Sequence, residues 1–273
     1  MNRALAWLSR AAVVALVLAI AFPLYFAVVS ALTPEALLFE APPLVPRDLV
    51  LDHFRALFEE RAFWLPIRNS LLVAGATTAF CVALGSPCAY ALARLDFRGK
   101  VPILGFVLAV SMFPQITIVS PLYLVLRELG LIDTYPGLIL PYVTFAMPLT
   151  IWLLVGFFRQ LPRELEEAAM VDGASRLRIF VEIILPLAAP GLVTTGILTF
   201  VYSWNEFLFA LSFTTGPQRQ TVPVAIALFR GQYQVPWGQI LAATVLATAP
   251  VALVVLAFQR RIVRGLTSGA VKG

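Results

Sequence analysis

The sequence predicts an all-α membrane protein with six transmembrane helices. Of its 273 residues, 60% are hydrophobic and only 13% are charged, and the mean hydropathy is +0.88. Typical soluble domains carry roughly 25% charged residues. Apolar stretches that could cross a bilayer core of about 30 Å, which takes about 20 helical residues, recur along the chain. These observations predict one polytopic helical domain over residues 1–273.

Each expected span is an apolar stretch that is long enough to cross the membrane. The six stretches are, in order, Ala11–Leu32, Asn69–Ala93, Val101–Leu126, Thr134–Phe158, Ile183–Asn205 and Gly231–Gln259. For the first stretch a cleaved signal peptide is the alternative, because Arg3 and Arg10 precede it. The apolar run is longer than a usual signal-peptide core and has no good small-x-small cleavage site, which favours a retained helix.

The positive charges outside the spans predict the orientation of the chain. One face, which includes both termini, carries thirteen Lys and Arg residues, whereas the other carries six, with Arg68 at a boundary. Cytoplasmic loops are enriched in Lys and Arg, so both termini and the segment 159–185 are expected in the cytoplasm. The segments 33–66 and 212–237 then face outward. Prolines in the first of these indicate a semi-rigid connection to a short amphipathic piece around Asp52 to Phe63.

The densest charge cluster of the chain lies in the cytoplasmic segment 159–185. Pro162 suits a first helical turn, and the acidic side chains that follow it complement the positive end of a helix dipole. Gly173 suits a helix stop. After it, apolar residues follow the spacing of one helix face: Leu177, Phe180, Val181, Ile184 and Leu185. The pattern predicts a short helix, a bend and a second helix.

Two environments are open to this predicted helix pair. An amphipathic helix next to a span often rests on lipid headgroups, but binding to anionic lipid needs a basic surplus. From Arg159 to Glu182 there are four arginines against five acids. Ala168 and Ala169 are small enough to let another backbone approach closely, as at tight helix contacts. The charge balance therefore favours docking to a protein partner.

At these residues the sequence resembles the permease subunits of ATP-binding-cassette (ABC) importers. Their cytoplasmic signature is Glu-Ala-Ala, three residues, Gly, nine residues, Ile, one residue, Leu-Pro. The chain matches every element, with Glu167-Ala168-Ala169, Gly173, Ile183 and Leu185-Pro186. Its closing residues, 265–273, resemble the tail of the second permease of maltose-type systems. Further short matches resemble the carbohydrate-uptake branch: Phe113-Pro114, Pro121-Leu122-Tyr123, Leu129-Gly130-Leu131, Pro162-x-Glu164-Leu165, Asp172-Gly173-Ala174 and Trp204-Asn205-Glu206-Phe207.

The resemblance implies a type I ABC importer permease fold in the inner membrane of a prokaryote. It implies four kinds of partner: a homologous second permease, a dimer of ATP-binding subunits that hold ATP and Mg²⁺, an extracytoplasmic sugar-binding protein, and membrane lipid. The segment 159–185 would contain the coupling helix. Its contacts with an ATPase subunit would involve Glu167, Ala168, Ala169, Asp172, Gly173, Ala174 and Phe180. Sugars are the implied cargo, and glycerol-phosphate or a polyol is the alternative within the family.

The sequence offers no catalytic chemistry of its own. No Gly-x-x-x-x-Gly-Lys-Ser/Thr phosphate loop appears, so the energy is expected from a partner. The one histidine, His53, is expected to be a surface residue, and no cluster has the spacing of metal ligands. An intramembrane enzyme would need several polar groups at depth, but only Glu206 interrupts an apolar stretch. An ion-driven secondary transporter would also need more ionisable groups within its spans.

Two polar groups are candidates for contact with the cargo or its carrier. Tyr202, Asn205 and Glu206 either lie near the outer end of the translocation path or form an interfacial aromatic belt, with Glu206 in headgroup water. In the outward segment 212–237, amide and aromatic side chains suit sugar recognition. By resemblance, this segment reaches the sugar-binding protein through Gln218, Gln220, Gln232 and Tyr233.

Overall fold

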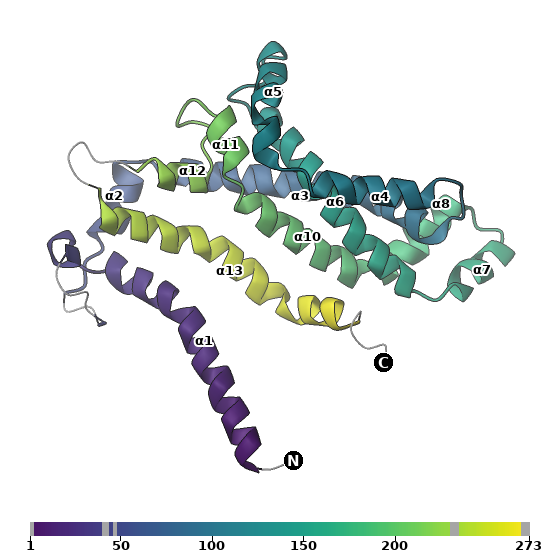
Figure 1. Ribbon diagram of the computed structural model, residues 1–273, viewed down its shortest axis with the longest axis horizontal. Helices are drawn as coiled ribbons and strands as arrows, with labels where there is room; N and C mark the ends of the chain where they lie inside the picture. Colours follow the sequence, from purple (N-terminus) through teal and green to yellow (C-terminus); the bar gives the residue numbers. More distant parts are fainter. Residues whose placement is uncertain (1–2, 40–43, 46–47, 230–234, 269–273) are drawn as a thin grey trace. The chain divides into compact units, whose positions relative to one another are not determined.

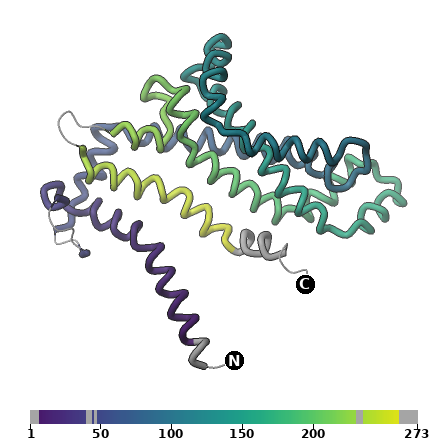
Figure 2. Tube along the Cα trace, viewed as in Figure 1, coloured from purple at the N-terminus to yellow at the C-terminus, as the bar shows by residue number. Residues whose placement is uncertain are grey.

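The computed structural model describes residues 3–39, 44–45, 48–229 and 235–268. In these ranges every regular element is a helix (Figure 1). The chain divides into two compact units, and Figure 2 allows each to be followed along the sequence. The first unit comprises Met1–Leu65 with Ala225–Pro250, and the second comprises Pro66–Val224 with Val251–Gly273.

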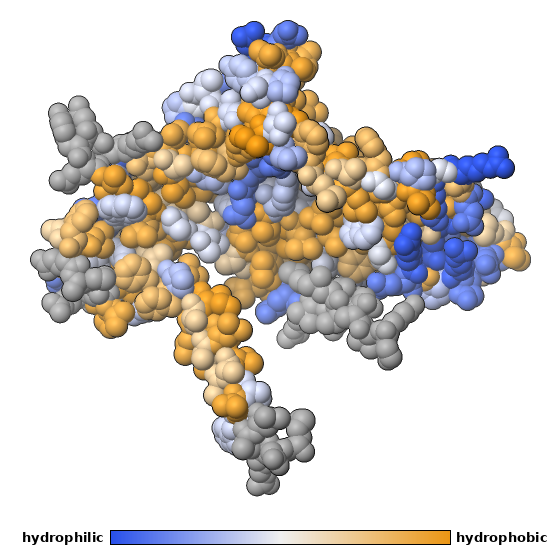
Figure 3. Space-filling view, viewed as in Figure 1, coloured by the Kyte–Doolittle hydropathy of each residue, from blue (hydrophilic) through white to orange (hydrophobic). Residues whose placement is uncertain are grey.

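The first unit contains a long N-terminal helix, the segment that follows it and the first part of the last helix. Its elements are α1 (Arg3–Ala31), η1 (Glu35–Phe39), α2 (Asp52–Glu59) and the start of α13 (Trp237–Ser268). The predicted amphipathic piece is confirmed by α2, which buries Leu57 and leaves charged residues outward. Large apolar side chains of α1 such as Trp7 and Ile20 are exposed, and Figure 3 shows a mainly apolar α1 surface. Such a surface suits contact with lipid or with another membrane helix.

The second unit is built on three long helices and several short ones. Its elements are α3 (Trp64–Arg94), α4 (Lys100–Ser111), α5 (Gln115–Glu128), α6 (Tyr135–Gln160), α7 (Glu164–Val171), α8 (Arg176–Arg178), η2 (Ile179–Ile184), α9 (Leu185–Leu187), α10 (Ala189–Trp204), α11 (Leu208–Phe213) and α12 (Val222–Ala227). Helix α3 crosses the boundary between the units within its first turn, and α12 crosses the other boundary in its middle. In Figure 3, hydrophilic residues gather over the part that carries α7.

The described helices supply six spans when each bent helix pair is taken as one span. Four are continuous: Trp7–Ala31, Trp64–Arg94, Tyr135–Gln160 and Trp237–Gln259. Two are broken: Lys100–Ser111 with Gln115–Glu128, bent by 91°, and Arg176–Leu187 with Ala189–Trp204, bent by 75°. Six predicted spans are thereby confirmed, whereas their continuity was predicted wrongly for the third and fifth.

The two breaks and the late start of the last helix have local causes. Pro114 adopts an extended conformation before α5, and Pro190 lies in the first turn of α10, a position that proline favours. The sixth span was predicted from Gly231, but α13 begins at Trp237, directly after Pro236. Gly231 itself lies outside the described residues. Hydropathy averaged over the length of a span does not locate these boundaries, because each of them depends on a single proline.

Two apolar clusters hold the second unit together. One joins α3, α6, α7 and η2 around Phe158, Phe180 and Ile184. The other joins α3, α5, α6 and α11 around Tyr142, Phe209 and Phe213. Helices α6 and α10 are also joined by a buried hydrogen bond between the Thr150 and Thr199 hydroxyls, 2.9 Å apart. Inside a membrane such bonds contribute about 0.6–2 kcal/mol each, so packing must supply the remaining stability.

Candidate functional site

The segment after α6 folds as the predicted helix, bend and second helix. Helix α7 ends at Val171, and Gly173 has a φ of 77°, in the left-handed region. The Ala174 N–H donates to the Ala169 carbonyl at 2.9 Å, and the Gly173 N–H donates to the Met170 carbonyl at 3.1 Å. These two bonds form a Schellman motif, which satisfies carbonyls that the helix end would leave unpaired. The role of Gly173 as a helix stop is confirmed.

The second helix differs from its predicted apolar face. It continues through α8 into η2, a π-helical segment over Ile179–Ile184. Leu177 and Val181 are exposed, whereas Ile179, Phe180 and Ile184 are buried. A π-helix closes its bonds five residues back, so residues 179 and 184 share a face. The prediction that Leu177 and Val181 share one apolar face with Phe180 and Ile184 is therefore wrong.

A buried ion pair anchors α7 to the end of α3. Arg94 Nε lies 3.0 Å from Glu166 Oε1, and the two side chains are 4% and 14% exposed. The pair is not aligned as a hydrogen bond, but the Tyr90 hydroxyl donates to Glu166 Oε2 at 3.1 Å. Arg94 Nη2 also donates to the Leu161 carbonyl, at the end of α6. The Glu166 carboxylate thus ties α7 to α3, and the Arg94 guanidinium ties the end of α3 to the end of α6.

Sequence reasoning missed the anchoring role of Glu166 and Arg94. Arg94 counted only toward the orientation, and Glu166 counted toward the helix dipole and the charge balance of the segment. One signal was available for Glu166. It lies three residues before Ala169, so the side chains of Glu166 and Ala169 lie on the same helix face. Ala169 is buried in the same cluster as Tyr90.

The opposite face of α7 is exposed. Glu167, Ala168, Asp172 and Gly173 lie on the surface, and Ala174 is half-buried. Apolar side chains lie among them, with Val171 87% exposed and Leu177 72% exposed. Of the seven residues predicted for this surface, Ala169 and Phe180 are buried and instead hold the helix in place. An exposed apolar group rimmed by charges is typical of a protein contact.

A second candidate site, formed by several polar residues, lies where α10 ends. A hollow of about 430 Å³ is lined by Gln115, Val201, Tyr202, Asn205, Glu206, Phe207 and Leu208. Gln115 was not predicted, and its Nε2 donates to the Tyr202 hydroxyl. The Asn205 amide donates to the Val201 carbonyl at 2.8 Å. The three predicted residues are therefore neighbours on one hollow, joined there by a residue from α5.

Glu206 accepts hydrogen bonds through its carboxylate from backbone N–H groups of the next helix. It is 7% exposed, and its carboxylate accepts from the N–H groups of Phe209 at 2.8 Å and Ala210 at 3.1 Å. These are first-turn donors of α11, so Glu206 caps that helix from its N-terminal side. The alternative that placed Glu206 in headgroup water does not fit the structure, because the helix start encloses the carboxylate.

The loop before α12 is held in place by hydrogen bonds to its backbone carbonyls. The Asn69 amide donates to the carbonyls of Gln218 and Gln220 at 2.9 Å each. Asn69 accepts from the Tyr135 hydroxyl at 2.8 Å, and Arg219 stacks on the Tyr135 ring at 4.3 Å. The side chain of Gln218 remains exposed and that of Gln220 is half-buried. The other two predicted contact residues, Gln232 and Tyr233, lie outside the described residues.

Residues 82–268 match the family described as "Binding-protein-dependent transport system inner membrane component". The chain belongs to this family. The permease is 49% identical over 232 residues to the trehalose transport system permease protein SugB of Mycobacterium tuberculosis, covering 84% of this chain and 85% of that relative. It is 44% identical over 238 residues to the trehalose/maltose transport system permease protein MalG of Thermococcus litoralis, covering 86% of each.

The fold of the permease also matches solved structures. A chain of a bacterial ABC transporter that imports the acidic polysaccharide alginate superposes with a TM-score of 0.79 at 19% identity, covering 95% of the permease and 98% of that chain. At this identity the likeness concerns the fold alone. The predicted fold class and the predicted identity as an ABC importer permease are confirmed, and the permease is an inner-membrane transport component.

Proposed function

We propose that the permease forms half of the translocation path of an ATP-driven carbohydrate importer and couples that path to a separate ATPase subunit. The permease family and the sugar-permease relatives support this proposal, including a diacetylchitobiose uptake permease of Streptomyces coelicolor that is 36% identical over 269 residues. The observation that carries the coupling role is the placement of α7. Buried contacts anchor one face of this helix to α3, and its opposite face is exposed.

The exposed face of α7 is the proposed contact with the ATPase subunit. It presents Glu167, Ala168, Asp172 and Gly173, with Val171 as the most exposed apolar side chain. Motion of that partner would be passed inward through the anchors described above. Because Glu166 and Arg94 join α7 to both α3 and α6, a displacement of the short helix moves two span ends together.

The hollow at the end of α10 is the proposed path surface. Amide groups of Gln115 and Asn205 and the hydroxyl of Tyr202 can exchange hydrogen bonds with sugar hydroxyls. Glu206 is occupied by backbone donors, and the lining contains no Lys, Arg or His. A lining of this kind suits a neutral solute better than a phosphorylated one, which supports a sugar over glycerol-phosphate.

The remaining subunits follow from this assignment. A second permease would complete the path, two ATP-binding subunits would hold ATP and Mg²⁺, and an extracytoplasmic sugar-binding protein would deliver the cargo. With both termini cytoplasmic, the segments 33–66 and 212–237 would face that binding protein. A solved neighbour of the fold, with a TM-score of 0.67, is an alginate transporter in complex with an alginate pentasaccharide-bound periplasmic protein.

Reconstitution tests the proposal. The complex would be purified from native membranes by a tag on this chain, placed in vesicles, and assayed for ATP hydrolysis with the co-purified binding protein and a sugar panel. We expect loaded binding protein outside to raise hydrolysis inside, because coupling between the two sites is reciprocal. Transport by the purified chain alone, or a purified complex that lacks an ATPase subunit, would contradict the proposal.

A further inference from the structure

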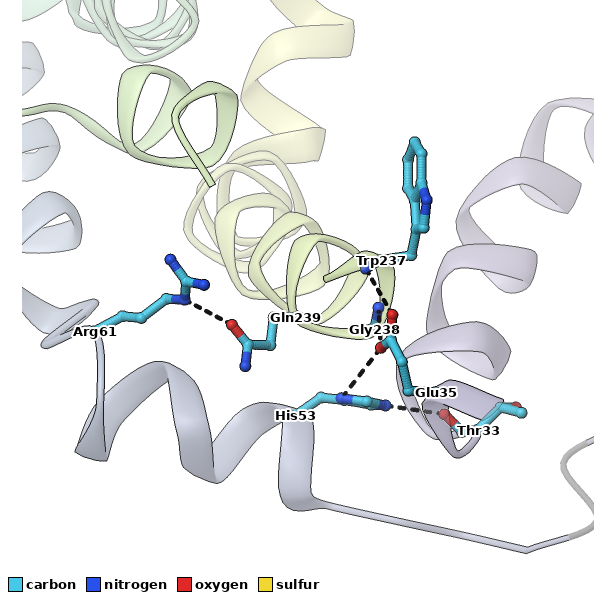
Figure 4. A network of polar contacts seen from close by, with 7 residues as sticks. All are labelled: Thr33, Glu35, His53, Arg61, Trp237, Gly238 and Gln239. Atoms are coloured by element: carbon cyan, nitrogen blue, oxygen red, sulfur yellow. Dashed lines mark hydrogen bonds and ion pairs between the residues drawn. The ribbon is translucent and has the colours of Figure 1, made fainter. Parts of the chain in front are cut away.

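In the first unit, a residue from the outward segment caps the last helix. Glu35 Oε1 accepts from the Trp237 N–H at 3.0 Å, and Oε2 accepts from the Gly238 N–H at 2.9 Å (Figure 4). The first N–H groups of a helix have no partner within it, and a negative charge there is favourable. In most helices a residue adjacent in sequence supplies this cap. Here it comes from Glu35 in η1, far away along the chain.

A second bond holds the same turn from another side. Arg61 Nε donates to Gln239 Oε1 at 2.6 Å, and the Arg61 guanidinium stacks on the Phe229 ring at 4.6 Å. Figure 4 shows Arg61 and Glu35 approaching the first turn of α13 from different sides. One contact would let the helix pivot, whereas two contacts fix its position and its rotation.

His53 lies between Glu35 and the Thr33 carbonyl and contacts both. Its Nε2 donates to the Thr33 carbonyl at 3.0 Å, and its Nδ1 lies 3.9 Å from Glu35 Oε2. The side chain is only 12% exposed, so the expectation of a surface histidine is wrong. A Cβ at Gly238 would lie 2.3 Å from the His53 ring and 2.6 Å from Glu35 Oε2. The close approach of these groups therefore requires glycine at position 238.

We propose that Glu35, His53, Arg61, Gly238 and Gln239 form an outward clasp that makes the outward segment and the start of α13 a single rigid body. The inference rests on the proposed function, in which a loaded binding protein docks on the outward segments. Force applied there by the docked protein would pass directly into the last span. Glu35 and Arg61 are thus positioning residues for transport.

The first test measures ATP hydrolysis by the reconstituted complex as the concentration of loaded binding protein rises. Replacing Glu35 with Ala removes both helix-capping bonds. We expect the half-saturating concentration to rise by about fivefold, the factor that corresponds to loss of a typical helix cap, while the maximal rate is retained. Glu35→Gln keeps one acceptor oxygen and should give a smaller rise.

Two further variants separate the clasp from general damage to the helix. Gly238→Ala should raise the half-saturating concentration, although alanine favours a helix over glycine by about 1 kcal/mol. The matched control is Glu59→Gln on α2, where an exposed pair with Arg55 contributes little. Unchanged half-saturation in Glu35→Ala and Gly238→Ala, with normal stimulation of the wild type, would overturn the clasp alone. A wild type that no loaded binding protein stimulates would overturn the proposed function.

A cross-link tests rigidity directly. Arg61→Cys and Gln239→Cys would be combined with Cys81→Ser and Cys88→Ser and joined by a short reducible cross-linker. If the two elements move as one body, we expect the cross-linked complex to retain transport. Loss of transport that returns on reduction would show that they must separate during the cycle, which would overturn the proposal.

Discussion

Glu166 and Arg94 form an ion pair with a separation of 3.0 Å at the point where the short helix α7 meets the end of α3. Both side chains are largely buried, and Glu166 also accepts from Tyr90. The neighbouring acid, Glu167, is exposed. Two adjacent carboxylates therefore have different physical roles, which mutation can separate.

Replacement of Glu166 should destabilise the permease. Glu166→Ala leaves the Arg94 charge buried without its partner, and breaking such a pair costs about 3–5 kcal/mol. We expect a lower unfolding temperature for the purified complex in detergent, together with loss of stimulated hydrolysis. The double variant Arg94→Met with Glu166→Gln removes both charges and should recover part of the stability. Equal stability of Glu166→Ala and the wild type would contradict the anchoring role.

Replacement of Glu167 should weaken assembly without weakening the fold. Glu167→Lys reverses an exposed charge on the proposed contact face, and like-charge contacts at an interface cost affinity. We expect less ATPase subunit to co-purify with the tagged permease, and an unchanged unfolding temperature of the permease alone. An undiminished yield of that subunit would show that this face is not the contact.

Gly173 should tolerate asparagine better than valine. No atom in the described part of the chain lies within 4 Å of the position that a Cβ would take, so a substitution acts through the backbone and not through a clash. A left-handed conformation costs an ordinary residue about 1–2 kcal/mol, and asparagine adopts it more readily than a β-branched residue. We expect Gly173→Val to lose transport and Gly173→Asn to retain most of it. Equal transport by both variants would argue against the bend as the essential feature.

Replacement of Glu206 should lower the yield of folded protein more than it affects transport. Glu206→Ala leaves the N–H groups of Phe209 and Ala210 unpaired in a buried setting, at a cost of about 1–3 kcal/mol each. Glu206→Gln keeps an acceptor oxygen. We therefore expect poor yield of folded protein for the alanine variant and near-normal yield and transport for the glutamine variant. A glutamine variant that folds well but transports nothing would assign the carboxylate to the path instead.

The sequence predicts the features of this permease that depend on local order. Hydropathy locates six spans, and Gly173 predicts the bend, because only glycine adopts a positive φ without cost. The breaks at Pro114 and before Pro190 could be suspected, but their angles depend on the packing of neighbouring helices. Sequence could not show which of Glu166 and Glu167 faces inward, because that choice depends on Arg94 and Tyr90.

Contacts between distant residues were hidden for a similar reason. Gln115 reaches Tyr202, and Glu35 reaches the start of α13, only because the fold brings their helices together. His53 was misjudged because a histidine outside the predicted spans is usually exposed, whereas Thr33, Glu35 and Gly238 surround it here.

The π-helical segment Ile179–Ile184 gives the distance between Gly173 and Leu185-Pro186 a geometric meaning. Each residue of an α-helix rotates the following side chains by about 100° around the axis. The wide turn takes up one residue more than an α-helical turn, so removing one residue there would convert it to an ordinary turn and leave the side chains after it close to their present directions. The extra residue of the segment therefore decides which side chains between Gly173 and Pro186 face the apolar cluster, and it brings Ile179, Phe180 and Ile184 into that cluster together.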